Sequence, residues 1–303
     1  MESDFSVLIP ARGTCPFLAQ TLESISSSSK SPKEVILVDD GISSTTLKEI
    51  ESFQSRLNLI VLPNRGQGLV DGLNTGLQYS STKYIARLDA DDLASPDRFE
   101  LQIEALTTNP EIVVLGGQAT YIDSMGEVTG FSNYANGRLD NLPEFKTSCM
   151  IAHPAAMIRR SAALDVGGYR SICTDGRIDL AEDFDLWLRI SLKGQVHNLG
   201  ASILFYRQHG DQISTLYTPG QVFATKYVSL VHIAEQINPN FQVKKLEIGP
   251  FKFNFLINSF KSLSHYAAYK FRLQLILEGL LIFLGLPDGV SSRILRKLIR
   301  FLV

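Results

Sequence analysis

The amino-acid sequence predicts an α/β fold built on a doubly wound sheet that becomes mixed in its second half. Two observations lead to this prediction. Short apolar runs alternate with helical patterns through residues 1–92, and from about residue 119 the pattern changes to that of a hairpin. Strands that alternate with helices pair in parallel, because each helix returns the chain to the same edge of the sheet. Ligands of such sheets gather at the carboxyl ends of the strands.

The first half of the chain supplies the alternating elements. Apolar runs closed by Pro, Asp or Gly predict strands at 5–9, 34–38, 57–62 and 84–88. Apolar side chains spaced three or four residues apart predict helices around 18–25, 47–50 and 69–77. We expect Pro10 to end the first strand, because proline has no N–H to donate to a neighbouring strand.

The second half is less regular. Ser95, Pro96 and Asp97 are typical of a helix start, with a serine cap, a proline at the first position and an acid in the first turn. The remaining patterns predict strands at 113–117 and 155–158, a hairpin over 119–131, a tight turn at 167–170, a helix opened at 182 and closed by Gly194, and a strand ending at Arg207.

Three carboxylates follow the strand at 84–88: Asp89, Asp91 and Asp92. Like charges this close raise one another's pKa, so the arrangement costs free energy unless a cation lies among them. A divalent ion that prefers oxygen ligands, Mg²⁺ or Mn²⁺, meets that need and commonly bridges to substrate phosphates. An acidic turn without an ion is the alternative, since Asp is common in turns. Asp39 and Asp40 end a strand at the same edge of the sheet, which favours a site.

Composition limits the partners. A net charge of −2 over 303 residues argues against nucleic acid, whose phosphates require a basic surface. Cysteines are few and scattered, without zinc-site spacing, and residues 1–4 lack the basic and apolar regions of a signal peptide, so we expect a reducing cytosol. The turn after the first strand lacks the Gly-x-Gly-x-x-Gly of dinucleotide-binding folds, which argues against NAD.

Several side chains of the second half are suited to chemistry. His153 is either a structural hydrogen-bonding residue or a ligand. Asp183 opens a helix, where the helix dipole favours acids, yet a carboxylate held there can also deprotonate an acceptor hydroxyl. Trp187 lies one turn later and offers an indole face on which a sugar can stack. Arg207 and His209 follow a strand; arginine binds phosphate with two N–H groups, and histidine either donates to phosphate or ligates a metal.

Together these residues resemble the family 2 glycosyltransferases, inverting enzymes with the GT-A fold, of the bacterial cell-surface polysaccharide type. The resemblance runs from about residue 5 to residue 214. Six motifs in the expected order carry it: Ser6 to Pro10, Val38 to Gly41, Tyr84 to Arg98 with an Asp-x-Asp element, His153-Pro154, Glu182 to Trp187, and Tyr206-Arg207-x-His209. The resemblance implies a GT-A doubly wound mixed sheet at 1–215, followed by a C-terminal helical extension at 216–303.

The resemblance also implies a role for individual residues. Asp183 would be the catalytic base. The donor would be bound by Pro10, Asp39, Asp40, Asp89, Arg207 and His209. The metal, Mn²⁺ or Mg²⁺, would be bound by Asp91, Asp89 and His209. Beside these implied roles, we expect Glu182, Trp187 and His153 to bind the acceptor.

The implied activity is metal-dependent inverting transfer of a sugar from a nucleotide-diphosphate donor to a saccharide or lipid-linked acceptor. A metal stabilises charge on the leaving diphosphate, and a single displacement needs one base and no enzyme nucleophile. Two alternatives stay open: a sugar nucleotidyltransferase, and a catalytically inactive sugar-binding protein. Arg12 and Gly13 stand where the family often has an aromatic residue and an asparagine, which leaves the nucleotide base open.

The C-terminal tail is amphipathic and basic. In residues 290–303, Arg293, Arg296, Lys297 and Arg300 lie opposite a face of Ile and Leu. This pattern is typical of a helix that lies on an anionic membrane surface, and it predicts a peripheral location on the inner face of the cell membrane. The alternative is a helix packed on the catalytic domain with its basic face in solvent.

Overall fold

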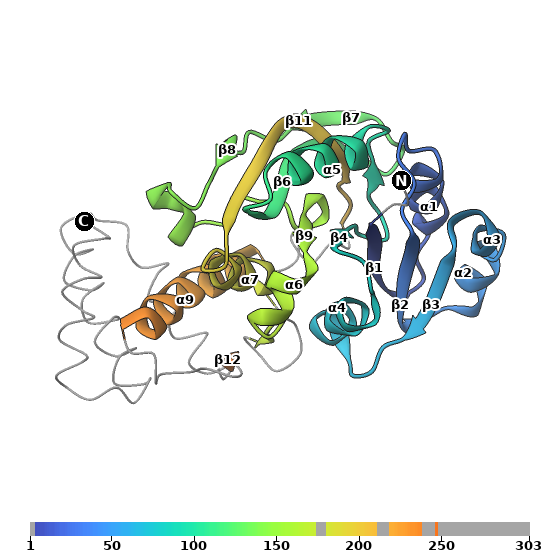
Figure 1. The fold of residues 1–303 in the computed structure, drawn as a ribbon. Coiled ribbons are helices and arrows are strands. Elements are labelled where there is room, and N and C mark those ends of the chain that lie inside the picture. The colour runs from blue at the N-terminus through green and yellow to red at the C-terminus, as the bar shows by residue number, and fades with distance from the viewer. Residues whose placement is uncertain (1–3, 174–179, 211–217, 238–245, 248–303) are drawn as a thin grey trace.

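The computed structural model describes residues 4–173, 180–210, 218–237 and 246–247. Figure 1 shows a central sheet with helices on both of its faces. The amphipathic pattern predicted at 290–303 lies outside the described residues.

The first half of the sheet is parallel, in the strand order β3-β2-β1-β4. Its strands are β1 (Phe5–Gly13), β2 (Glu34–Ile42), β3 (Leu59–Pro63) and β4 (Tyr84–Arg87). The helices between them are α1 (Leu18–Ser26), α2 (Ser44–Glu49), α3 (Phe53–Leu57) and α4 (Gly68–Tyr79). The predicted alternation is confirmed, except that the second connection contains two short helices instead of one.

Pro10 does not end β1, which continues to Gly13. Backbone directions alternate along a strand, and the carbonyl of Leu8 accepts from Leu88 on the β4 side. Pro10 therefore directs its nitrogen to that same side, where pairing with β4 has already ended at Leu8. The missing N–H costs no hydrogen bond there, while Pro10 stays in register with Val38 of β2.

The second half of the sheet is mixed, as predicted. The order continues β4-β9-β6-β11-β5; β9 is antiparallel to both of its neighbours, β6 is parallel to β11, and β5 is antiparallel to β11. The predicted hairpin is β6 with β7. The bounds are β5 (Leu93–Ala94), β6 (Ile112–Ile122), β7 (Val128–Phe131), β8 (Gly137–Arg138), β9 (Met157–Arg159), β10 (Ile172–Cys173), β11 (Gln195–Arg207) and β12 (Leu246–Glu247).

The helical segments of the second half are α5 (Arg98–Thr108), α6 (Arg160–Asp165), α7 (Glu182–Ile190), α9 (Thr218–Ile237) and the short 3₁₀ turns η1 (Pro143–Lys146) and η2 (His153–Ala155). Helix α5 starts after the predicted cap, because the Ser95 hydroxyl donates to Asp97 and makes no bond to the helix. Helix α7 ends at Ile190, before Gly194. A Cβ at Gly194 would lie 2.5 Å from the Glu111 carbonyl, so this glycine permits a close backbone approach and does not cap the helix.

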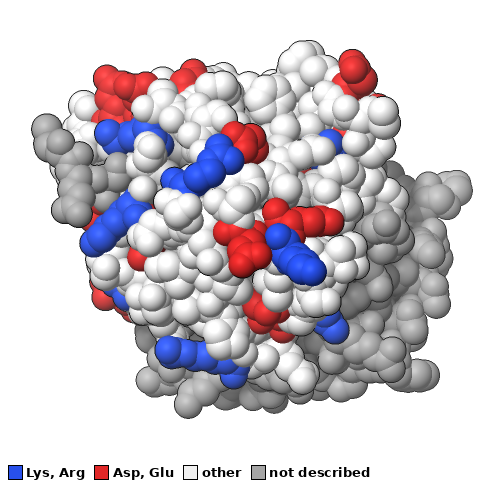
Figure 2. Space-filling model, turned by 90° about the vertical axis from the view of Figure 1, so that its right-hand side faces the viewer, with Lys and Arg blue, Asp and Glu red and all other residues white. Residues whose placement is uncertain are grey.

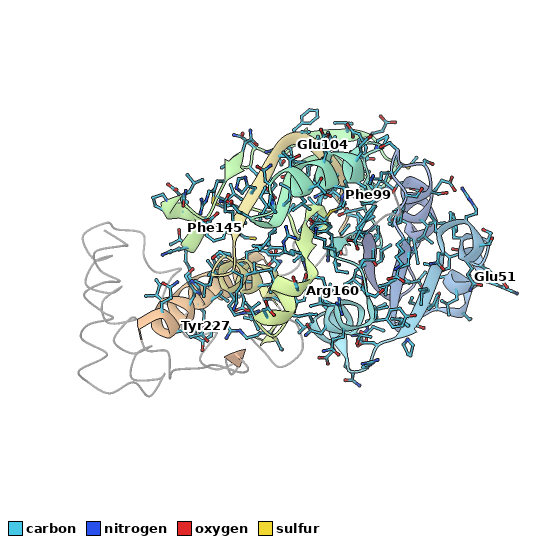
Figure 3. The ribbon with its side chains drawn as sticks, viewed as in Figure 1. Glu51, Phe99, Glu104, Phe145, Arg160 and Tyr227 are labelled. Carbon is cyan, nitrogen blue, oxygen red and sulfur yellow. The ribbon has the colours of Figure 1, made fainter. Side chains whose placement is uncertain are left out.

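Two hydrophobic layers cover the two faces of the sheet. Alternate residues of β1 point to opposite faces: Phe5 belongs to the layer covered by α1, α3 and α5, and Leu8 to the layer covered by α4, α6 and α7. The ring of Phe99, on α5, lies 5.1 Å from that of Phe5, and Phe99 is labelled in Figure 3. Both faces of the sheet are therefore buried, as in other doubly wound folds.

Helix α9 shares the core with α7. Ala224, Tyr227, Val228 and Val231 are buried in the layer that also contains Phe184 and the other inward residues of α7, and Figure 3 labels Tyr227 on this helix. The predicted division of the chain at residue 215 stays a prediction. No helix among the described residues is long and apolar enough to cross a membrane.

Charges of both signs lie on the surface of the described chain. Figure 2 shows the side that is on the right in Figure 1, where Lys and Arg are interspersed with Asp and Glu and no broad basic area is present on that face. This agrees with the near balance of charge in the sequence.

Candidate active site

The acidic loop (residues 88–92) follows β4 at the carboxyl edge of the parallel strands. The backbone fixes its start, because the Leu88 N–H donates to the Leu8 carbonyl over 3.1 Å. One carboxylate oxygen from each of Asp89, Asp91 and Asp92 lies within 4.8 Å of the others. The first two side chains are half-buried and Asp92 is fully buried. The structure therefore assembles the predicted carboxylate cluster.

Two buried arginines lie beside the acidic loop. Arg87 on β4 forms an ion pair with Asp89. Burial alone would lower the pKa of Arg87, but the charge of Asp89 raises it overall. Burial lowers the pKa of Arg98 to about 9 against the charge of Asp92, so Arg98 is still a cation at neutral pH. The protein's own cations therefore offset part of the repulsion that the sequence attributed to a metal.

Arg207, at the end of β11, forms hydrogen bonds with the acidic loop. Its backbone N–H donates to Asp92 over 2.8 Å, and its guanidinium donates to the carbonyls of Asp91 and Asp123. The guanidinium also lies over the ring of Phe17, 4.2 Å from the ring centre. With 1% of its surface exposed, Arg207 is placed to position the loop, which differs from the diphosphate contact implied by the resemblance.

The carboxylates of the acidic loop suit a hard divalent ion. Burial and the neighbouring charges of Asp89 and Asp91 raise the pKa of Asp92 well above its usual value. Burial and Asp89 also raise the pKa of Asp91, against the effect of His209, whose Nε2 lies 2.9 Å from Asp91 Oδ2. Asp92 Oδ2 is buried without a hydrogen-bond partner among the described residues. Oxygen ligands supplemented by imidazole match the preferences of Mg²⁺ and Mn²⁺.

Asp39 and Asp40 lie near the end of β2 at the same edge and are both half-buried. Asp39 Oδ1 accepts from the backbone N–H groups of Gly41, over 2.8 Å, and of Ile42, within the last residues of β2. Asp40 accepts from the backbone N–H of Gly68, at the start of α4, and from the side chain of Asn64. Both predicted donor-binding carboxylates are therefore fixed by hydrogen bonds, Asp39 within its own segment and Asp40 to the segment before α4 and the first residue of that helix.

The loop after β1 joins these two acidic regions. Burial raises the pKa of the Cys15 thiol, and the charges of Asp91 and Asp39 raise it further, against a hydrogen bond to the Arg12 carbonyl. Arg12 Nη1 lies 3.8 Å from Asp40, with most of the arginine side chain exposed. The predicted donor residues on β1, β2 and β4 therefore meet at one edge of the sheet.

The start of α7 carries the predicted base. Ala181 precedes the helix in the left-handed conformation, with φ +66°. Asp183 is half-buried; its Oδ1 accepts from the Phe184 N–H over 2.7 Å, and its Oδ2 lies 3.5 Å from the thiol of Cys149. Burial and the charge of Glu182 raise the pKa of Asp183. A carboxylate with a raised pKa is suited to general base catalysis.

His153, in η2, contacts the start of α7 and the residue after the turn at 166–168. Its Nε2 is 3.0 Å from the Tyr169 hydroxyl, and its Nδ1 is 3.5 Å from Glu182. Burial lowers the pKa of His153 to about 3, although the charges of Asp183 and Asp89 both oppose this shift. His153 is therefore neutral and buried at physiological pH.

Trp187 is not where an acceptor sugar could stack on it. The side chain is 1% exposed and belongs to the hydrophobic layer between α7 and the sheet. Its ring meets that of His153 edge-on, with 5.8 Å between ring centres. The predicted stacking role is wrong, because a helical pattern does not show which apolar residue of a helix faces solvent.

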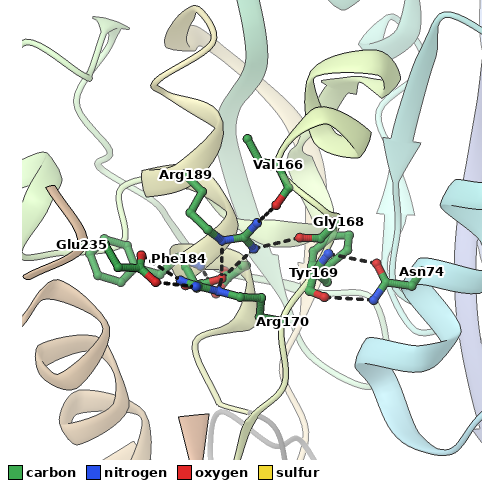
Figure 4. A network of polar contacts seen from close by, with 10 residues as sticks. Asn74, Val166, Gly168, Tyr169, Arg170, Phe184, Arg189 and Glu235 are labelled. Carbon is green, nitrogen blue, oxygen red and sulfur yellow. Dashed lines mark hydrogen bonds and ion pairs between the residues drawn. The ribbon is translucent and has the colours of Figure 1, made fainter. Parts of the chain in front are cut away.

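A buried ion network fixes α7 to its surroundings (Figure 4). Asp185 accepts from both Arg170 and Arg189, and Arg170 also donates to Glu235 on α9. Arg189 further donates to two carbonyls of the turn at 166–168. The two glycines of this turn have φ of +84° and +72°, which confirms the predicted tight turn.

The network also extends to α4. Asn74, on this helix, donates to the carbonyl of Tyr169 and accepts from its N–H, as Figure 4 shows. The same helix presents the Gly68 N–H to Asp40. Polar contacts therefore connect Asp40, through α4 and the backbone of Tyr169, with the network that holds α7.

A comparison with known families identifies the chain. The model of "Glycosyl transferase family 2" matches residues 6–167. This chain belongs to that family. It is a glycosyltransferase with the GT-A fold, as the sequence motifs imply.

Relatives of this glycosyltransferase are found among both sequences and structures. The amylovoran biosynthesis glycosyltransferase AmsE of Erwinia amylovora is 30% identical over 65% of this chain and 73% of its own length. The UDP-Gal:alpha-D-GlcNAc-diphosphoundecaprenol beta-1,3-galactosyltransferase of Escherichia coli is 29% identical over 63% of this chain and 68% of its own. The crystal structure of S. aureus TarS 1-349 in complex with UDP-GlcNAc aligns with a TM-score of 0.63 at 17% identity, over 95% of this chain and 83% of that one.

Sequence reasoning missed several residues of the glycosyltransferase site. Arg87 and Arg98 partly offset the negative charge of the acidic loop, and Cys149 contacts Asp183, the predicted base. The two arginines are close in sequence to the carboxylates, so their positive charge could have indicated that they pair with the loop. Cys149 is 34 residues from Asp183 and belongs to no motif, so nothing in the sequence indicated this contact.

Proposed function

We propose that this glycosyltransferase transfers a sugar from a nucleotide-diphosphate donor with inversion and with the help of a divalent metal. The observation that carries the proposal is the convergence of Asp89, Asp91 and Asp92 within 4.8 Å at the carboxyl edge of the sheet. Ligands of doubly wound sheets bind at this edge, and carboxylate oxygens are the ligands that Mg²⁺ and Mn²⁺ prefer.

The metal would be held by Asp91 with Asp89 and His209. When bound, it supplies positive charge for the diphosphate that leaves the sugar. Arg207 donates to the Asp91 carbonyl and Arg98 to the Arg87 carbonyl just before the loop, so these contacts would fix the carboxylates before the donor arrives. Asp39 and Asp40, on the neighbouring loop, would bind the base and ribose of the nucleotide.

Asp183 would remove the proton of the acceptor hydroxyl. The acceptor oxygen then attacks the anomeric carbon from the side opposite the diphosphate, which inverts that centre in one displacement. His153 and Glu182 lie beside this base and would contact the acceptor or orient the groups that do. The buried, neutral His153 is suited to hydrogen bonding and carries no charge of its own.

We propose a saccharide or lipid-linked saccharide as acceptor, in the synthesis of a cell-surface polysaccharide. The printed names of the relatives support this, because one is a biosynthesis enzyme for amylovoran and one names a diphosphoundecaprenol substrate. The basic, amphipathic pattern at 290–303 supports a peripheral position on an anionic membrane surface. Flotation with vesicles of anionic lipid should carry the full chain upward and leave a deletion of 290–303 behind; equal flotation of both would contradict the membrane proposal.

The transfer reaction is tested with a panel of nucleotide sugars and of saccharide or lipid-linked acceptors. We expect release of a nucleoside diphosphate that requires Mn²⁺ or Mg²⁺ and is lost in Asp91→Asn. Glu104→Gln, the same type of change at an exposed position of α5, serves as the matched control and should keep full activity. Metal-independent release, or full activity in Asp91→Asn, would contradict the proposal. Release of pyrophosphate from a nucleoside triphosphate and a sugar phosphate would support a nucleotidyltransferase instead.

A further inference from the structure

The carboxylate of Asp183 has two fixed partners of different kinds. Its Oδ1 accepts from the Phe184 N–H, which is part of the helix and cannot move away. Its Oδ2 lies 3.5 Å from the thiol of Cys149, in the loop between η1 and η2. The same sulfur lies 3.4 Å from the carbonyl of Ile151. A thiol has one proton, so it serves one of these two acceptors at a time or is shared between them.

The thiol of Cys149 is protonated at neutral pH. Burial raises the pKa of Cys149 well above its usual value, and the charge of Asp183 raises it further. Cys149 is therefore a donor beside a carboxylate and is not a nucleophile. A charged carboxylate attracts the proton more strongly than a neutral carbonyl does, because hydrogen bonds to ionised acceptors are stronger.

We propose that Cys149 is a positioning residue for the base: its thiol donates to Asp183 Oδ2 while the carboxylate is charged, and turns to the Ile151 carbonyl once the carboxylate has accepted a proton. No proton leaves Cys149. The contact fixes the orientation of Oδ2 before the reaction and frees this oxygen as it becomes neutral. The inference rests on the proposed role of Asp183 and adds a residue that controls when that base is charged.

The first test is the pH dependence of kcat/KM for sugar transfer. Loss of a donor to the charged form raises the pKa of a carboxylate. Cys149→Ala should therefore move the acid limb upward by about half a pH unit, which is about a threefold lower rate on that limb, with little change on the plateau. Cys149→Ser restores a hydrogen-bond donor, so its acid limb should lie close to that of the parent enzyme. Ser148→Ala, an exposed neighbour, is the matched control and should leave the profile unchanged.

The second test observes the thiol directly and needs no turnover. The infrared S–H band of Cys149 is identified by its loss in Cys149→Ala, or in Cys149→Ser if the alanine variant does not fold. As the pH is lowered through the titration of Asp183, we expect this band to move to higher frequency, because the thiol exchanges a charged acceptor for a neutral one. The band of Asp183→Asn should stay at the higher frequency at every pH.

The role of Cys149 would be contradicted if the acid limb did not move in Cys149→Ala and the S–H band did not shift as the pH is lowered. Asp183→Asn separates this outcome from a failure of the proposed function. If Asp183→Asn keeps full transfer activity, the base assignment itself is wrong. If Asp183→Asn is inactive while the profile of Cys149→Ala equals that of the parent enzyme, only the inference about Cys149 is wrong.

Discussion

The acidic loop and the start of α7 both carry clustered carboxylates, but the protein satisfies them differently. In the acidic loop, Asp89 and Asp91 are half-buried. Asp89 forms an ion pair with an arginine, and Asp91 contacts a histidine. On α7, Asp185 is buried and accepts from two arginines. Asp183, two residues earlier, accepts from a backbone N–H and lies beside a thiol. We infer that carboxylates already saturated by fixed cations are structural, and that those left short of cations are available for chemistry.

The largest effect is expected where a carboxylate lacks a fixed cation. Asp183→Asn removes the proposed base and should lower the rate of transfer by about 10²- to 10⁴-fold. The thermal midpoint should hardly move, because no arginine loses a partner. Steady-state kinetics and a melting curve on the same sample measure both effects. A large loss of stability with normal turnover would reverse the comparison.

The next largest effect is expected at Asp185, a carboxylate on the same helix that is already paired with two arginines. Asp185→Asn leaves Arg170 and Arg189 without their shared carboxylate in a buried site. Removing one partner of a buried ion pair costs about 3–5 kcal/mol, and we expect a loss in this range in the free energy of unfolding. Denaturant titration measures it. A variant as stable as the parent would show that saturation by arginine does not mark a structural carboxylate.

His153 should make stability depend on pH. Its pKa is about 3 in the folded protein against an ordinary value of 6.5. Between these values the unfolded chain binds a proton that the folded chain does not, so the free energy of unfolding falls as the pH falls. From pH 7 to pH 5 the loss should be about 2 kcal/mol. Denaturation of His153→Gln should show a flatter dependence over this range, and an equally steep one would contradict the assignment.

The smallest effect is expected at an exposed pair. Arg56 donates to Glu23 with two N–H groups on the surface, a geometry similar to that of Arg170 with Asp185. Solvent screens such pairs, so Arg56→Ala should change the melting temperature far less than Asp185→Asn does. Comparable shifts in the two variants would mean that burial is not what separates the two ion pairs.

Much of the parallel half of the fold could be predicted from the sequence. The alternation of apolar runs and helical patterns placed β1 to β4, and the parallel order then placed Asp40 and Asp91 at one edge. These are local patterns joined by a general rule of handedness. The continuation of β1 past Pro10 could not be predicted, because it depends on where β4 stops pairing.

The contacts between distant segments could not be predicted. The burial of Trp187 depends on how α7 packs on the sheet, and a single helical pattern does not show this. The place of Arg207 beneath the acidic loop depends on β11 lying next to β5 and β6. Cys149 meets Asp183 only after the loop between η1 and η2 reaches α7. Residue types indicated the chemistry, but the partners of each group came from tertiary structure.

The central claim is that Asp91, with Asp89 and His209, holds a divalent ion against the diphosphate of the donor. Binding of Mn²⁺ measured by electron paramagnetic resonance, with nucleoside diphosphates offered one at a time, tests it without any assumption about the acceptor. We expect Mn²⁺ to bind in the presence of one nucleoside diphosphate, and to bind at least about tenfold more weakly in Asp91→Asn than in the parent or in Glu104→Gln. Equal Mn²⁺ affinity in all three proteins, or none in the parent with any nucleoside diphosphate, would contradict the account.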